Sequence, residues 1–174
     1  HIRFGSEIVG PVDAVDLVNN SFSVLDQVVE VRTNTVFDDS LDGDLAGLAG
    51  QTVEVHALFD AVTGNYVATR VEARADAAFY KLRGLVSQLD TRTRSFQIGD
   101  AVISYLNVAD ADLPSGLADG MRVRVRLAKV QVAGEWVAVT VRSGVRKVED
   151  HADARIRGTV TAYTSDSRFE VNGI

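Results

Sequence analysis

The sequence predicts an all-β protein made of tandem small barrels, each with five strands and a short helix or turn between strands three and four. Two observations support this fold class: one segment occurs three times, and a later set of strand patterns occurs twice. The threefold segment has a glycine, a polar run and then a phenylalanine, spaced by 74 and 74 residues for the glycines and by 74 and 73 for the phenylalanines. A fixed period of this size indicates tandem units. The residues concerned are Gly10, Gly84 and Gly158, and Phe22, Phe96 and Phe169.

The second strand of each unit and the turn after it can be located from the three copies. In the first copy Phe22 and Val24 alternate with serines, which is the period of a half-buried strand. The next two residues are Leu25-Asp26 in the first copy, Gly99-Asp100 in the second and Asn172-Gly173 in the third. Asn-Gly favours a tight hairpin turn because both residues tolerate positive φ. The repeat therefore predicts a tight turn at Asp26 in the first unit.

The later strands recur at an offset of 70 residues. Residues 50–55 match 120–125, and residues 64–68 match 134–138, in both cases with a glycine before an apolar strand pattern. The preceding loop, rich in leucine, alanine, acids and glycine, suits a short helical turn or two. The resulting order of three strands, a short helix and two strands is that of the OB fold, a small five-stranded barrel.

The repeats give an expected domain organisation. Residues 1–6 form the end of a preceding unit or a tail, 7–78 the first OB-like unit, 79–150 the second, and 151–174 the start of a third, incomplete unit. A unit of this size buries only a modest core, so neighbouring units are expected to stabilise one another.

The combined pattern resembles a bacterial repeat family of unknown function. The shared features are a Gly-hydrophobic start, a polar turn, Phe-x-Val, then Gly-x-x-Val-x-Val and a Gly-turn-aromatic-Val-Ala strand. Members of that family form OB-like β-barrels in exported or lipid-anchored proteins. The resemblance implies an extracytoplasmic location and a non-enzymatic role, and it supplies no catalytic residues.

Composition and charge exclude several classes of protein. The 174 residues are 46% hydrophobic and 24% charged, which is typical of a globular chain, and no apolar run approaches the ~20 residues of a membrane-spanning segment. The absence of cysteine excludes disulfides, thiolate metal sites and a cysteine nucleophile. The net charge is −6, with −7 in residues 10–83 and +2 in residues 84–157. An acidic balance argues against a nucleic-acid partner, which requires a basic face.

No arrangement of residues typical of an enzyme is present. The three histidines, His1, His56 and His151, lack metal-ligand spacing and suggest no Ser-His-Asp arrangement. The glycines near residue 45 lack the Lys-Ser/Thr of a phosphate-binding loop. We therefore expect no catalysis and no cofactor.

One acidic loop is a weak candidate for a metal site. The segment Asp38-x-Ser40-x-Asp42-Gly43-Asp44 has the spacing of the opening of an EF-hand calcium loop, in which oxygens at positions one, three and five precede a sharp glycine turn. The twelfth position, which needs a bidentate glutamate, is Ala49. We therefore expect a charged, solvated loop without a metal.

Three arginines form a second candidate site. Arg122, Arg124 and Arg126 alternate with apolar residues, so strand geometry places them on one face. OB folds bind oligonucleotides on a basic face studded with aromatic residues. The first unit has Thr52, Glu54 and His56 at the same positions, so the simpler expectation is a polar face directed toward the acidic neighbouring unit.

Tyr66 and Trp136 are equivalent aromatics and form a third candidate. They lie out of phase with the valines of their strands. If the valines face the core, the aromatics face outward, where tyrosine and tryptophan are enriched in contact patches. Alternatively, a bulge near Ala68 and Ala138 turns both aromatics inward.

Two functions remain open at this stage. The first is an extracytoplasmic structural or adhesive repeat protein that associates with other copies of itself or with cell-surface material. Tyr66 and Trp136 are its expected contact residues. The alternative is a ligand-binding module that uses the barrel face for a sugar, a peptide or an ion.

Overall fold

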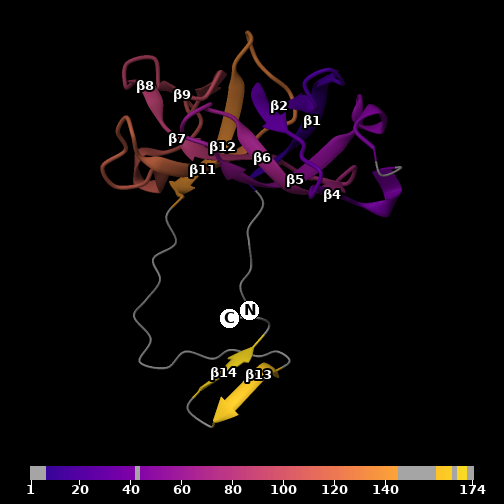
Figure 1. Ribbon diagram of the computed structural model, residues 1–174. Helices are drawn as coiled ribbons and strands as arrows, with labels where there is room; N and C mark the ends of the chain where they lie inside the picture. The colour runs from indigo at the N-terminus through magenta and orange to yellow at the C-terminus, as the bar shows by residue number, and fades with distance from the viewer. Residues whose placement is uncertain (1–6, 42–43, 145–159, 166–167, 172–174) are drawn as a thin grey trace. The chain divides into compact units, whose positions relative to one another are not determined.

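The computed structural model describes residues 7–41, 44–144, 160–165 and 168–171. The chain divides into two compact units, Gly5–Arg146 and a second formed by His1–Phe4 with Lys147–Ile174. Apart from single turns of 3₁₀ helix, all regular structure in the described ranges is β-strand, which confirms the all-β fold (Figure 1). The expected tail or unit end at residues 1–6 lies outside these ranges.

Five strands of the first half form a closed barrel. β1 pairs with β2 and β5, β2 with β3, and β5 with β6, all antiparallel. A parallel pairing of β3 with β6 closes the ring. The short strand β4 also pairs with β6. The strands are β1 (Ile8–Asp16), β2 (Ser21–Val24), β3 (Gln27–Glu30), β4 (Val36–Phe37), β5 (Thr52–Phe59) and β6 (Tyr66–Ala73).

Alternation of side chains explains why these strands enclose a core. Val53 and Val55 on β5 are fully buried, while Thr52 and Glu54, which alternate with them, are only partly buried. Two 3₁₀ turns, at Asp39–Leu41 and Ala46–Leu48, lie between β4 and β5. They contribute buried leucines to the same core, namely Leu41 and Leu48, with Leu45 between the turns.

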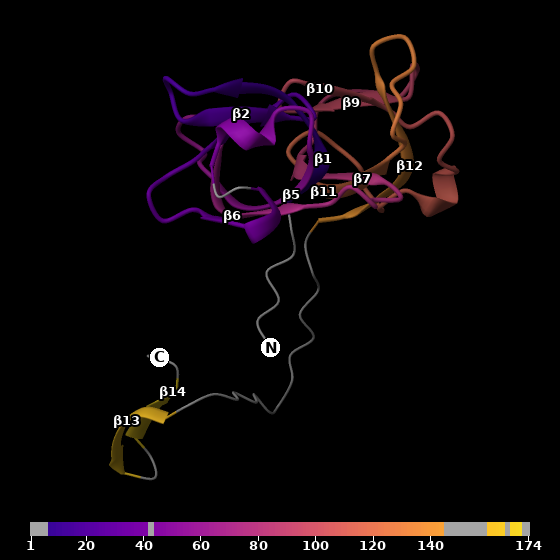
Figure 2. The same ribbon diagram turned by 90° about the vertical axis from the view of Figure 1, so that its right-hand side faces the viewer.

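The second half of this unit is also built of paired strands. β11 pairs with β7 and β12, β8 with β9, β9 with β10, and β10 runs parallel to β12. The chain passes from β7 through Val86, which is buried, into β8. These strands also enclose a core. Figure 2 shows the two barrels side by side. The strands are β7 (Tyr80–Leu85), β8 (Ser87–Asp90), β9 (Ser95–Ile98), β10 (Ala101–Ser104), β11 (Arg122–Leu127) and β12 (Trp136–Ser143).

Both predicted tight turns are confirmed. Val24 pairs with Gln27, and Ile98 pairs with Ala101, so each hairpin has a two-residue turn. The φ angles are 51° at Leu25, 58° at Asp26 and 55° at Gly99. A leucine with positive φ is uncommon. Leu25 is fully buried, and the burial of its side chain offsets the backbone strain.

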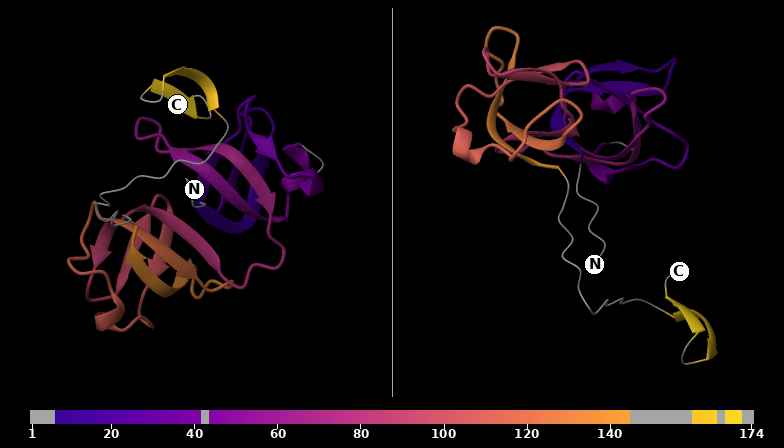
Figure 3. Two further views of the ribbon diagram at one scale, coloured as in Figure 1. Left: turned by 90° about the horizontal axis from the view of Figure 1, so that it is seen from below. Right: turned by 90° about the vertical axis from the view of Figure 1, so that its left-hand side faces the viewer.

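The two barrels are joined through their first strands. β1 and β7 pair antiparallel, with Ile8 opposite Leu82 and Val9 opposite Lys81. The pairing makes one continuous sheet in the order β6-β5-β1-β7-β11-β12. The left view of Figure 3 shows these strands from below.

In the C-terminal part of the chain, β13 (Val160–Ser165) and β14 (Arg168–Val171) form an antiparallel hairpin. It lies within the range 151–174 expected to start a third unit. The predicted turn at Asn172-Gly173 falls outside the described residues.

Candidate functional site

The outer face of β7, β11 and β12 gathers six cationic side chains. The register places Arg124 between Arg83 on β7 and Arg142 on β12, and Arg126 opposite Lys81. None of the three strands contains an aspartate or glutamate. The six residues are Lys81, Arg83, Arg122, Arg124, Arg126 and Arg142. The predicted alignment of the three β11 arginines on one face is therefore present, because Val123, Val125 and Leu127 between them are buried.

A single carboxylate binds two of these cations. Glu7, which is 8% exposed, accepts hydrogen bonds from Arg83 Nη1 and Arg122 Nη2, both at 3.1 Å. Arg83 Nη2 also donates to the carbonyl of Gly144. Sequence reasoning missed Glu7, because it lies before the first strand, at the expected domain boundary. Arg122, which was expected on a face directed toward the acidic first unit, has Glu7 as its ion-pair partner, the residue just before β1.

The remaining arginines of the face point into solvent. Arg124, Arg126 and Arg142 are exposed, and within the described ranges no ion pair joins them to a carboxylate. Lys81 is more enclosed, and burial lowers the pKa of its amine, while the nearby Glu54 raises it. The signal for the missed members of the face was present in the strand patterns Lys81-x-Arg83 and Thr140-x-Arg142.

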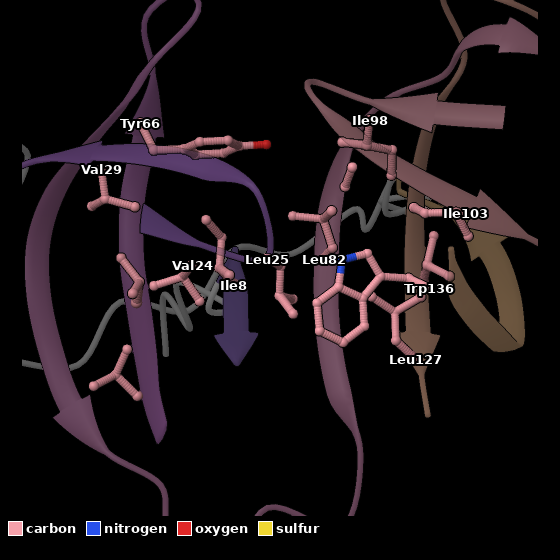
Figure 4. Packing of buried hydrophobic residues seen from close by; sticks show 14 of the residues in the cluster. Ile8, Val24, Leu25, Val29, Tyr66, Leu82, Ile98, Ile103, Leu127 and Trp136 are labelled. Atoms are coloured by element: carbon pink, nitrogen blue, oxygen red, sulfur yellow. The ribbon is translucent and has the colours of Figure 1, made fainter. Parts of the chain in front are cut away.

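Tyr66 and Trp136 lie at the junction of the barrels. Their side chains are 2% and 6% exposed. The Tyr66 hydroxyl donates to the carbonyl of Arg83 at 2.7 Å, and Trp136 Nε1 donates to Asp26 Oδ2 at 2.8 Å. Figure 4 shows both rings directed into the region between the barrels, with the indole beside Leu25 and Leu82. The two aromatics thus connect the first barrel to the second in both directions.

β-Bulges account for this orientation. The register of β5 and β6 shifts between His56 and Ala57, which leaves Thr69 without an opposite residue, and a matching shift leaves Val139 unpaired on β12. One extra residue reverses the alternation on that side of the bulge. The expectation of outward-facing aromatics is therefore wrong, and the inward arrangement is the one present.

Gln27 is a third link across the junction. Its amide Nε2 donates to the carbonyl of Ile98 at 2.8 Å and to that of Leu25 at 3.1 Å, and the residue is 4% exposed. A Cβ atom at Gly99 would lie 2.3 Å from Gln27 Oε1, so the glycine gives this side chain its space. Sequence reasoning did not find Gln27, although it stands two residues before Val29 on the inward face of β3.

In the candidate metal loop, carboxylates accept hydrogen bonds from backbone N–H groups of the same loop. Asp38 Oδ1 accepts the backbone N–H of Ser40 at 3.1 Å, and Asp44 Oδ1 accepts that of Gly47 at 2.9 Å. The Ser40 N–H lowers the pKa of Asp38. Asp42 lies outside the described residues. No cluster of three potential metal ligands occurs in the part of the chain that the structure describes.

A pocket of about 570 Å³ opens at one end of the second barrel. The guanidinium of Arg94 lies 5.0 Å above the Tyr105 ring, and it donates to Asp110 Oδ1 and to the Val108 carbonyl, both at 2.6 Å. Burial raises the pKa of the Tyr105 hydroxyl. The pocket is lined by Leu89, Thr91, Arg94, Tyr105, Asp110 and the loop 113–117. Arg94 therefore holds Val108 and Asp110, which precede the lining loop 113–117.

No helix in the described segments is long and apolar enough to span a bilayer.

Comparison with known proteins gives one match. No curated protein and no solved structure matches the chain. Residues 9–72, within the first barrel, match the family model of DUF5666, a domain of unknown function.

Proposed function

We propose that the chain is a non-enzymatic, extracytoplasmic structural or adhesive repeat protein, in which two tandem OB-like units act as one rigid two-barrel body. The body associates with other copies of itself or with cell-surface material. One observation carries this proposal. Ile8 pairs with Leu82, and these residues are 74 positions apart, which is the period of the sequence repeat.

A strand pairing between equivalent positions is what a local twofold axis between two copies of a unit produces. Other contacts support such an axis. Tyr66 and Trp136 occupy equivalent positions, and each donates a hydrogen bond from its own barrel to the other. The 3₁₀ turns at 39–41 and 46–48 stand between the third and fourth barrel strands, where an OB fold carries its helix.

The polar groups of the junction support a structural role. Gln27, Tyr66 and Trp136 each use a buried donor to hold the neighbouring barrel. Buried polar groups that are fully satisfied favour one arrangement of the packed units. The extracytoplasmic location rests on the family resemblance alone.

Sedimentation velocity of the chain 1–174 tests self-association. We expect the weight-average sedimentation coefficient to rise with protein concentration, and the increase to be larger at low salt if charged faces orient the contact. A coefficient that stays at the monomer value up to millimolar protein at every salt concentration contradicts self-association.

A ligand-binding module is the second candidate, favoured by the Arg94–Tyr105 pocket. Its volume falls within the range of small-molecule sites. Thermal-shift screening with small sugars, peptides and ions tests it. Asp110→Ala is the matched variant, because this exposed carboxylate lines the pocket and holds Arg94. A ligand that stabilises both proteins equally does not bind there.

A further inference from the structure

The outer face of the continuous sheet differs in its charged side chains between the first-barrel half and the second-barrel half. On the first-barrel side, Glu54 is paired with Arg74 at 2.5 Å and Glu72 with Arg70 at 2.7 Å. The second-barrel side carries the six cations of β7, β11 and β12; Arg83 and Arg122 are paired with Glu7, and Lys81 lies 3.9 Å from Glu54. The other three, Arg124, Arg126 and Arg142, form no ion pair with a carboxylate among the described residues. This cationic face lies on a chain whose net charge is −6, so its basic character is not a property of the whole surface.

We propose that the cationic face binds a linear anionic polysaccharide through the sulfate or carboxylate groups of the polymer. The inference rests on the proposed function, because it names the class of cell-surface material that the two-barrel body contacts.

The spacing of the cations fits a polymer with regularly repeated anions. Neighbouring strands lie about 4.8 Å apart, and alternate residues along a strand are about 6.7 Å apart. Arg83, Arg124 and Arg142 therefore form a row across the strands, and Arg124 and Arg126 a row along one of them. The three cations of the face that form no ion pair among the described residues, Arg124, Arg126 and Arg142, are arginines, whose planar guanidinium binds carboxylate and sulfate groups with two parallel hydrogen bonds.

Other anionic partners fit the face less well. The outward positions of the three strands carry no aromatic side chain, since Tyr80 packs against the buried Trp136 at 5.9 Å. Single-stranded nucleic acids would lack a stacking surface. A second copy of the sheet offers mainly glutamates that are already paired, such as Glu54 and Glu72. A membrane plane would contact both halves of the six-stranded sheet, whereas a linear chain needs only the cationic half.

Affinity chromatography and titration on heparin, with neutral dextran as the reference polymer, test this assignment on the chain 1–174. We expect heparin binding at low salt that weakens steeply as salt is added, and no dextran binding. The double variant Arg124→Glu/Arg126→Glu should bind about tenfold more weakly, because it replaces two contacts to the polymer by repulsions.

The matched control is Arg32→Glu/Arg92→Glu, which makes the same change in net charge at two exposed arginines on the first and second barrels, away from the cationic face. It should stay within about twofold of the parent, since only contacts at the face contribute the full interaction. Circular dichroism confirms that both double variants are folded.

Three outcomes would overturn the proposal. Heparin binding could be absent at low salt, or the two double variants could lose affinity equally, which indicates contact by net charge alone. Alternatively, oligo(dT) or phosphatidylserine vesicles could bind more tightly than heparin with the same dependence on Arg124 and Arg126. A chain that self-associates without binding heparin contradicts only this inference. A chain that binds heparin and stays monomeric contradicts only self-association.

Discussion

At the scale of single residues, Gly10 and Gly84 lie where the barrels have no room for a side chain. A Cβ atom would lie 2.6 Å from Leu25 Cγ at Gly10, and 2.3 Å from Ile98 Cγ2 at Gly84. Both obstructing residues are buried core side chains, Leu25 within the two-residue turn and Ile98 just before the equivalent turn. The repeated glycine is thus a packing requirement, and no positive φ is involved at either position.

We expect Gly84→Ala to lower the free energy of unfolding by roughly 1–3 kcal/mol, which is typical of overpacking a dense core. Chemical denaturation measures this value. Gly134→Ala is the control, because its Cβ meets nothing within 4 Å although φ is +82°. It should lose about 1–2 kcal/mol, because alanine at this positive φ is strained without any steric contact. A Gly84→Ala variant as stable as the parent would show that steric contact at Gly84 is unimportant.

The Tyr66 hydroxyl predicts a change of stability in alkaline solution. Burial, with the nearby Glu7 carboxylate as a second cause, raises the pKa of Tyr66 to about 12. Because the pKa in the folded state exceeds the value near 10 of an unfolded chain, the stabilising contribution is complete below pH 10. It is lost as the pH rises through about 12.

Tyr66→Phe should cost about 1 kcal/mol at pH 7, through loss of the hydrogen bond to Arg83. The variant should also lose less stability than the parent between pH 10 and pH 12. Urea denaturation at several pH values measures both effects. A variant with an unchanged alkaline slope would indicate that other groups cause the alkaline unfolding.

At the scale of elements, the turn Leu25-Asp26 orients the only tryptophan of the chain. Asp26 accepts the indole N–H of Trp136 across the junction. Asp26→Gly keeps the positive φ and removes the acceptor, so we expect a loss of about 1–3 kcal/mol of stability and a red-shifted tryptophan emission. Asp26→Asn retains an acceptor oxygen and should remain near the parent in both measurements. A red shift of similar size in Asp26→Asn would contradict a specific role for this hydrogen bond.

Elements were predictable from the sequence where local chemistry determines them. The two-residue turns at Asp26 and Asp100 followed from the Asn-Gly of the third copy, and the arginine face of β11 followed from alternation. The inward orientation of Tyr66 and Trp136 could not be settled, because a one-residue bulge at Thr69 or Val139 reverses the alternation without a local signal. The pairing of β1 with β7 and the Glu7 ion pairs depend on tertiary docking, which strand periodicity does not encode.

At the scale of the whole molecule, the shared sheet predicts cooperative unfolding of the two barrels. Side chains of both barrels contribute to one buried cluster, and Gln27, Tyr66 and Trp136 bind across the junction. Thermal unfolding followed by tryptophan emission and by far-ultraviolet circular dichroism should give coincident transitions.

Combining Gln27→Ala, Tyr66→Phe and Asp26→Gly removes three junction hydrogen bonds and should separate the two transitions. Transitions that are already separate in the parent chain would show that the barrels unfold independently.

Chelation should leave the folded chain unchanged. The Asp38 and Asp44 carboxylates accept backbone N–H groups of their own loop, so they are stabilised without a cation. We expect the melting temperature to be the same with calcium and with excess EDTA. A drop of several degrees with EDTA that disappears in Asp42→Ala would demonstrate a calcium site in this loop.

The two ends of the double barrel meet at one place. Arg83 binds the Glu7 carboxylate and the Gly144 carbonyl, and the Gly144 N–H donates to the Arg122 carbonyl. Residues 7 and 144 are therefore neighbours in space although 137 positions separate them in the sequence. A short linker could join them, and new ends could be opened at the exposed hairpin near Gly64, giving a circular permutant with the same strand pairings. For the same reason the double barrel is suited to insertion into a surface loop of another protein, because it would enter and leave its host at a single point.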